Sequence, residues 1–363
     1  MNTFVHIMPI WLGLVSLACC TGALVCRLWV LETSHTAAIP YYNKLLVGIS
    51  RFFGIAIAVL TASSVSELLA RTAEMSGVAV RSAPGVVPIV ITKTHYGHLW
   101  LISAMALSLL WIAWLLGKRY RDSRSLAVFM LCLDAVFAFS ISATGHASDA
   151  GDFSVAEIAD WFHLIAAAVW GGGLIVLSTV ILPKITGPDN RKAAIIAGIA
   201  RRFSTIAGIF VGVVAITALY NSWYFIGSLA AFSGTPYGLA AAAKIIFLCV
   251  LLFLGAFNRY INVALLQQWA GLPLKKETLF SRLTLNLYSR LTQSREGLTV
   301  AFRFMGSVKI EACLVVIVML LAAFLRHDIP ARHMAHFEHP GEGPASHSMH
   351  DGNDEMQHHG YHH

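Results

Sequence analysis

Long apolar runs are the feature that most constrains this chain. A helix needs roughly 20 mostly apolar residues to cross a bilayer. Runs of this length lie at about 4–31, 45–70, 98–117, 125–147, 158–182, 203–228, 238–260 and 305–326. We therefore predict an all-α membrane bundle of eight transmembrane helices, with no room for a large soluble domain.

The scarcity of charged residues supports this fold class. They make up 12% of the chain, whereas soluble domains carry roughly 25%. The apolar runs are also too continuous for the alternating strands of an outer-membrane barrel. No Lys or Arg precedes the first run, so we expect it to be a retained span and not a cleaved signal peptide.

Basic residues indicate the orientation of the spans. Lys and Arg cluster in the loops after the third, fifth and seventh runs, whereas the loops at 144–160 and 229–236 contain none. The loop at 71–97 is weaker evidence because it also holds basic residues. Since cytoplasmic loops are enriched in Lys and Arg, we expect a multi-pass membrane protein with both termini outside the cytoplasm.

The net charge of +7 follows from the same loops. We expect no nucleic-acid partner, because no basic face lies on a folded soluble domain. The longest cytoplasmic segment, 271–304, repeats Leu every four residues from Leu279 to Leu291. This spacing gathers the leucines on one helical face, so we predict an amphipathic helix on the inner surface of the bilayer.

Similar motifs recur in the two halves of the chain. Arg-Phe begins the second run (51–52) and the sixth (202–203), and Thr-x-Tyr-Gly begins the third (94–97) and the seventh (235–238). An even number of spans per unit gives both units the same orientation, related by an axis along the membrane normal. We predict two tandem four-helix repeats, with a site near their junction.

This repeat divides the chain into a first four-span unit (1–147), a second (148–326) and a tail (327–363). The tail mixes His and Met with acidic residues and Gly, so we expect it to be disordered. His-rich tracts bind metals, and Met suits Cu(I); the alternative is a purification tag, although the spacing is irregular. The predicted metal-capture residues are His333, Met334, His336, His339, His347, Met349, His350, His358, His359, His362 and His363.

The fifth run carries the strongest site signal. Asp160 and His163 are three residues apart, so they share a helical face. A carboxylate beside a metal-binding His can orient the ring. His146 reaches the same side of the membrane, and imidazole is a copper, zinc and iron ligand. We predict a metal site at His163, His146 and Asp160; a hydrogen-bonded His–Asp pair that locks two helices is the alternative.

Three further histidines map to the same side of the membrane. His6 begins the first run, and His95 and His98 precede the third. We treat all three as candidate ligands, although solvent-exposed histidines are common where a loop enters a span. We expect His35, on the opposite side, to be a solvated loop residue.

Four charged residues fall in or near the spans. They are Glu67, Asp134, Lys244 and Glu311. Ionisable groups inside a membrane usually face the bundle interior and pair with one another or mark an ion route. Both alternatives stay open for these residues.

The residues also carry a family resemblance, strongest from about 140 to 326. The stretches are Gly145-His146-Ala147, Asp160-x-x-His163 to Gly173, Arg202-Phe203-Ser204, Leu219-Tyr220-Asn221, Thr235-Pro236-Tyr237-Gly238, Lys244, Asn258-Arg259, Lys309 and Glu311. With these stretches the chain resembles the copper resistance protein D family of bacterial inner-membrane proteins. The resemblance implies copper transport across the inner membrane, described as uptake, beside a periplasmic copper-binding protein.

Three functions fit these observations. The first is a copper transporter, in which the tail gathers copper and the His site receives it at the outer face. The second is an electron-transfer protein with b-type haem held by paired histidines. The third is a scaffold or sensor that binds copper without moving it. We expect no enzyme activity, and no ATP-binding loop is visible for a pump.

Overall fold

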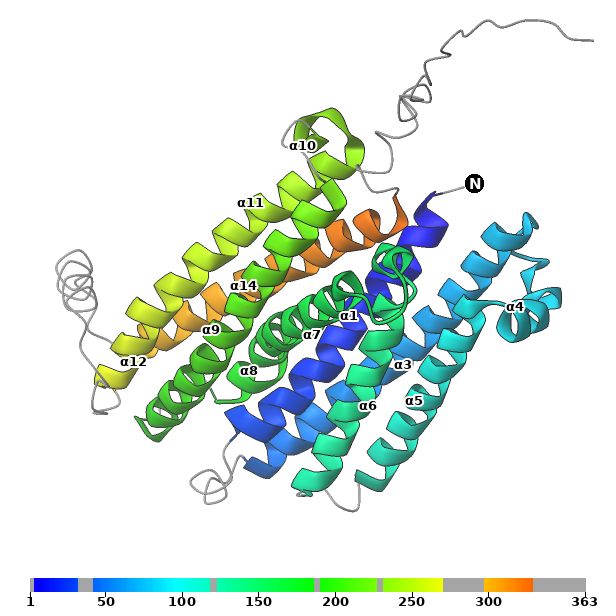
Figure 1. Cartoon of the computed structure of the whole chain (residues 1–363). Helices are drawn as coiled ribbons and strands as arrows, with labels where there is room; N and C mark the ends of the chain where they lie inside the picture. The colour runs from blue at the N-terminus through cyan, green and yellow to red at the C-terminus, as the bar shows by residue number, and fades with distance from the viewer. Residues whose placement is uncertain are drawn as a thin grey trace, which may run out of the picture.

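The chain folds into a bundle of long helices, shown by the computed structural model in Figure 1. The structure describes residues 3–31, 42–117, 123–185, 190–226, 231–269 and 297–328. Helices make up almost all of these residues, and no strand occurs among them. The predicted all-α class is therefore confirmed.

Eight helices in the described ranges are long and apolar enough to cross a membrane. They are α1 Thr3–Val25, α3 Tyr42–Ser76, α5 His95–Gly117, α6 Arg124–Ser142, α7 Val155–Val176, α9 Asn190–Ile226, α11 Pro236–Phe257 and α14 Gly297–His327. The shorter helices are α4 Val87–Lys93, α8 Leu182–Ile185, α10 Ala231–Gly234 and α12 Val263–Trp269. The prediction of eight spans is confirmed.

Two boundaries differ from the predicted ones. Helix α6 ends at Ser142, so His146 lies in the short 3-10 helix η3 His146–Ala150 and not in a span. The end of the predicted amphipathic segment, 297–304, forms the beginning of α14. The remainder of that segment, 271–296, and the metal-capture residues of the tail lie outside the described residues.

Side-chain caps explain where several spans begin. The hydroxyls of Ser123 and Ser154 accept hydrogen bonds from backbone N–H groups three residues later, at the starts of α6 and α7. Thr94 and Thr235 cap Gly97 and Gly238 in the same way, at 3.0 and 2.9 Å. Such caps satisfy N–H groups that a helix leaves unpaired. The Thr-x-Tyr-Gly motif that suggested a repeat therefore also has a local capping role.

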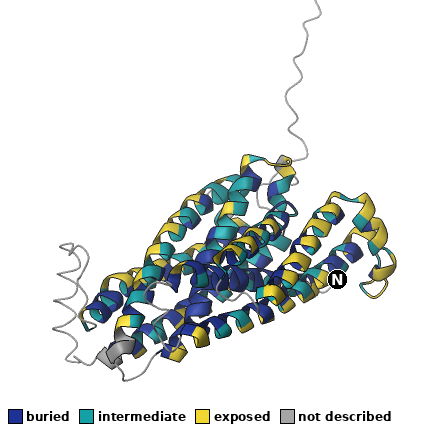
Figure 2. Cartoon of the chain, turned by 90° about the horizontal axis from the view of Figure 1, so that it is seen from below, coloured by how far each residue is buried: buried dark blue, intermediate teal, exposed yellow. Residues whose placement is uncertain are grey.

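Helices α1 and α7 cross at the centre of the bundle, where Figure 2 shows the deepest burial. Small residues permit the close approach. A Cβ atom added at Gly22 would overlap the backbone of Gly172, and one added at Gly172 would overlap the backbone of Ala18. Glycine at these two positions fixes the separation of the two central helices.

The two halves of the bundle have the same pattern of neighbours. In each half the first helix packs on the second, as α1 on α3 and α7 on α9, and the third packs on the fourth. The first helix of each half also packs on the fourth helix of the other. Both α1 and α7 continue into a π-helical segment, η1 Cys26–Val30 and η4 Leu177–Ile181. A duplicated unit would produce this pattern, but the duplication itself stays a prediction.

Large apolar side chains cover the outer faces of the helices. Leu219 is 74% exposed and Phe253 is 72% exposed, and Figure 2 shows exposed residues along the periphery. Apolar surface of this extent is unfavourable in water and marks contact with another apolar phase. The chain is a multi-pass membrane protein whose outer faces contact lipid.

Candidate metal centre

A cavity of about 250 Å³ lies between α1, α7, α9, α11 and α14. It extends along α11 from Tyr237 to Leu251, which is roughly 20 Å of helix at 1.5 Å per residue. Most of its lining is apolar. The polar side chains that line it are His146, Asp160, His163, Asn221, Ser222, Tyr237, Lys244 and Arg326. His146, Asp160 and His163 therefore all line the same cavity.

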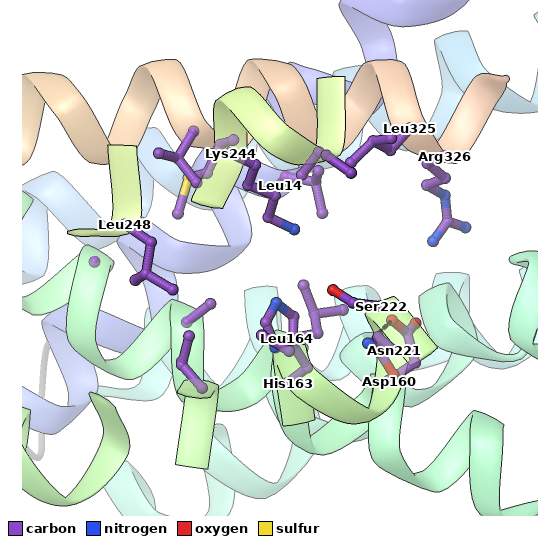
Figure 3. Close-up of a pocket in the computed structure, with 18 of the residues that line it drawn as sticks. Leu14, Asp160, His163, Leu164, Asn221, Ser222, Lys244, Leu248, Leu325 and Arg326 are labelled. Carbon is purple, nitrogen blue, oxygen red and sulfur yellow. Dashed lines mark hydrogen bonds between the residues drawn. The ribbon is translucent and has the colours of Figure 1, made fainter. Parts of the chain in front are cut away.

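His163 faces this cavity from α7 (Figure 3). Its Nδ1 lies 2.9 Å from the hydroxyl of Thr217 on α9. That hydroxyl also lies within hydrogen-bond distance of the carbonyls of Val213 and Val214, at 2.7 and 3.2 Å, and it has one hydrogen to donate. When the hydroxyl donates to a carbonyl, Nδ1 carries the ring proton and Nε2 keeps the free electron pair that a metal requires.

Asp160 is held by two donors. Its Oδ2 accepts a hydrogen bond from Ser142 at 2.9 Å, and its Oδ1 accepts one from Asn221 at 3.4 Å. Among the described residues no hydrogen bond joins Asp160 to His163, so the orienting role of Asp160 and the alternative of a direct His–Asp pair stay predictions. The residue that contacts the ring is Thr217, which sequence reasoning missed because its position one span away gave no local signal.

His146 lies in η3, where burial lowers the pKa of its imidazole below the ordinary value of 6.5. The ring is therefore neutral at neutral pH, the state that binds a metal. The backbone of Asp328 is a hydrogen-bond partner of the ring, whereas Nε2 is buried and has none. A buried polar atom without a partner is costly, so Nε2 is suited to receive a ligand.

Two cations line the wall opposite His163 and Asp160 (Figure 3). Lys244 comes from α11, and Figure 3 shows its ammonium on the side facing His163. Arg326 comes from the end of α14 and donates a hydrogen bond to the hydroxyl of Thr144 at 2.8 Å. Arg326 and the cavity-lining Met319 are further residues that the predicted site did not contain.

The other candidate histidines lie apart from the cavity lining. The ring of His6 stacks on that of His327, with centroids 5.3 Å apart. His95 pairs with Asp152 at 3.6 Å, and His98 contacts the carbonyl of Thr92 at 3.3 Å. Within the described ranges, no group of three or more His, Cys, Asp or Glu side chains is placed to hold a metal. Of the candidate histidines, His146 and His163 are the two that line the cavity.

The four charged residues in or near the spans do not all line the same cavity. Only Lys244 lines the cavity with the two histidines. Glu67 lines a small neighbouring cavity that Arg326 also reaches. Asp134 bonds to the hydroxyl of Thr21 at 2.5 Å in another part of the bundle, and Glu311 accepts a hydrogen bond from Asn258.

Comparison with known families decides which proteins this chain resembles. The family model described as Copper resistance protein D-like, N-terminal domain, matches residues 1–155, and the model described as Copper resistance protein D matches residues 197–325. The chain belongs to the copper resistance protein D family. His146 lies within the first match and Lys244 within the second, whereas His163 lies between them.

A curated relative agrees with this assignment. It is the copper transport protein CutJ of Bacillus subtilis (strain 168), which is 28% identical over 177 residues. The aligned part makes up 48% of this chain and 32% of the relative, so the chain spans about a third of the relative's length. No solved structure matches the chain.

Proposed function

We propose that this copper resistance protein D family member carries copper ions from the periplasm to the cytoplasm across the bacterial inner membrane. Copper would pass through the cavity lined by His146 and His163. The name of the curated relative, a copper transport protein, supports transport as the activity. A periplasmic copper-binding protein and the His- and Met-rich tail would supply the ion.

The proposed direction depends on the orientation of the bundle. The beginning of α1 and the end of α14 lie at the same end of the bundle (Figure 1). Basic residues cluster in the loops at the opposite end, which the positive-inside rule assigns to the cytoplasm. His146 and Arg326 then lie at the periplasmic end of the cavity, and the root of the tail lies beside them.

One observation carries the proposal. The Nε2 atom of His146 is buried without a hydrogen-bond partner, and its ring lines the same cavity as His163. Buried polar groups are almost always paired, and imidazole nitrogen is a copper ligand. A bound copper ion would satisfy Nε2 and would also use the free Nε2 of His163.

The inward route would continue below the cavity. Leu251 and Val315 line its deep end. Glu311 lies one helical turn from Val315, is 2% exposed and accepts a hydrogen bond from Asn258. An apolar constriction followed by a polar group is a common arrangement for a gated ion path. We assign Glu311 as the next contact for an ion that leaves the cavity.

The size of the cavity argues against haem. Pockets for drug-sized ligands measure about 300–1,000 Å³, and a porphyrin is at least drug-sized. The cavity of about 250 Å³ is better suited to an ion. An absorption spectrum of the purified protein tests this directly, because a Soret band would replace the transport proposal with haem binding.

Copper flux into proteoliposomes tests the proposal. We expect His163→Ala to abolish most of the uptake because it removes the ring that faces the cavity. His98→Ala is the matched control, since His98 is exposed and lies outside the cavity. Unchanged flux in His163→Ala would contradict the proposal. Copper binding by the unaltered protein without any flux would favour a scaffold or sensor.

A further inference from the structure

We infer that the cavity selects monovalent copper, Cu(I), and rejects divalent cations, and that Lys244 is the residue that sets this selectivity. The inference rests on the proposed function and names its substrate more closely. It depends on two properties of the cavity: the charge of its available donors and the charge of the wall opposite them.

Three of the possible donors in the lining are neutral. His146 and His163 offer imidazole nitrogens, and Met319, which also lines the cavity, offers a thioether. Thioether and imidazole donors suit copper, and thioethers favour Cu(I), whereas carboxylates suit harder ions. Among the described residues the lining also holds one carboxylate, Asp160, which accepts hydrogen bonds from Ser142 and Asn221; its single negative charge is outnumbered by the two cations of the lining.

The opposite wall is cationic. Figure 3 shows the Lys244 ammonium on the side of the cavity that faces His163. In the described part of the chain no hydrogen bond or ion pair holds this ammonium, and the carboxylate of Asp160 lines the same cavity. Arg326 lines the same cavity. Two cations against one carboxylate leave the charged lining with an excess of positive charge.

Coulomb repulsion converts this excess into selectivity. The repulsion between Lys244 and a bound ion is proportional to the charge of the ion, and it is strong where water is excluded. The repulsion between Lys244 and a divalent ion is therefore twice the repulsion between Lys244 and Cu(I). Neutral donors do not compensate for the second charge, whereas free carboxylates would. The same repulsion weakens binding of Cu(I) enough for the ion to leave, as a transport path requires.

Lys244→Met tests the inference, because it removes the charge and keeps an unbranched side chain. The full chain in proteoliposomes is given Ag(I), a redox-stable monovalent probe, or Zn(II), and the initial uptake rates are compared. We expect the unaltered protein to carry Ag(I) about tenfold faster than Zn(II), or more, and we expect Lys244→Met to reduce this ratio about tenfold. All variants keep the same tail, so a change in the ratio reports on the cavity.

Two control variants separate charge from packing. Lys244→Arg keeps the positive charge and should keep the ratio, as should Lys309→Met, because Lys309 is exposed on α14. If Lys244→Met fails to fold, Lys244→Gln replaces it. An unchanged ratio in the neutral variant, or an equal loss in Lys244→Arg, would overturn the inference.

The failures of the two proposals are distinguishable. Equal rates for Zn(II) and Ag(I) in the unaltered protein, with both rates lost in His163→Ala, would overturn the selectivity and leave the proposed transport intact. The absence of any His163-dependent flux would overturn the proposed function, and this inference with it.

Discussion

At the scale of single residues, the orientation of the His163 ring depends on the hydroxyl of Thr217. The hydroxyl of Thr217 lies within hydrogen-bond distance of Nδ1 of His163, at 2.9 Å, and this contact leaves Nε2 free for a metal. Thr217→Val has nearly the same shape but no acceptor. Loss of such an outer contact typically costs about 10–100-fold in metal affinity. We expect this loss in a silver titration of the purified protein, with a small change in its unfolding temperature.

Thr205→Val is the control for this residue-scale prediction. The Thr205 hydroxyl lies on the same helix, but it bonds only to the carbonyl of Arg201 at 3.1 Å. We expect its silver affinity to equal that of the unaltered protein. Equal affinities in Thr217→Val and Thr205→Val would show that the Thr217 hydroxyl does not orient the ring.

At the scale of helices, the crossing of α1 and α7 fixes the relative position of two walls of the cavity, because both helices line it. A Cβ atom at Gly172 would overlap the backbone of Ala18. Overpacking of this kind costs about 1–3 kcal/mol, so Gly172→Ala should lower the unfolding temperature in detergent. Gly212→Ala on α9 should not, since a Cβ atom there meets nothing within 4 Å. Equal stability of the two variants would contradict this account of the crossing.

Helix α14 contributes Glu311 below the cavity, and we predict that this residue affects how copper leaves the cavity. Glu311→Gln keeps an oxygen that accepts the hydrogen bond of Asn258 but removes the carboxylate. If Glu311 receives the ion, copper flux should fall several-fold while silver binding in the cavity stays unchanged. Cys313→Ala, an exposed change on the same helix, should leave the flux unchanged. Normal flux in Glu311→Gln would remove Glu311 from the route.

At the scale of the whole molecule, the tail begins at the mouth of the cavity. Arg326 lines the cavity, His327 stacks on His6, and the backbone of Asp328 bonds to His146. A tethered metal-binding segment raises the local concentration of its cargo. Removal of residues 329–363 should therefore reduce copper uptake several-fold at low copper and leave the rate at saturating copper unchanged. Proportional losses at both concentrations would point to a different role.

Much of the architecture was predictable from the sequence because the bilayer imposes a one-dimensional requirement. A span needs a sufficient apolar length, and this length is read directly along the chain. The eight spans were predicted in this way and are confirmed. The start of α11 is also a local feature of the sequence, because the hydroxyl of Thr235 accepts a hydrogen bond from the N–H of Gly238, three residues later. Such signals are local, so folding does not alter them.

The composition of the candidate centre was only partly predictable. The sequence singled out His146, Asp160 and His163, which line one cavity, but it grouped them with His6, His95 and His98, which lie elsewhere. Their common depth was visible in the sequence, whereas their position around the bundle axis was not. That position depends on which helices are neighbours.

The sequence by itself determined the class, the spans and the residue types available for chemistry, because each of these depends on residues close together in the chain. Only the tertiary structure decided that Thr217 contacts the His163 ring, and that Lys244 faces the same cavity. These contacts join residues from different helices. Their geometry is set by the crossing at Gly22 and Gly172 and by the packing of side chains around it, and a linear pattern does not encode that geometry in any single segment.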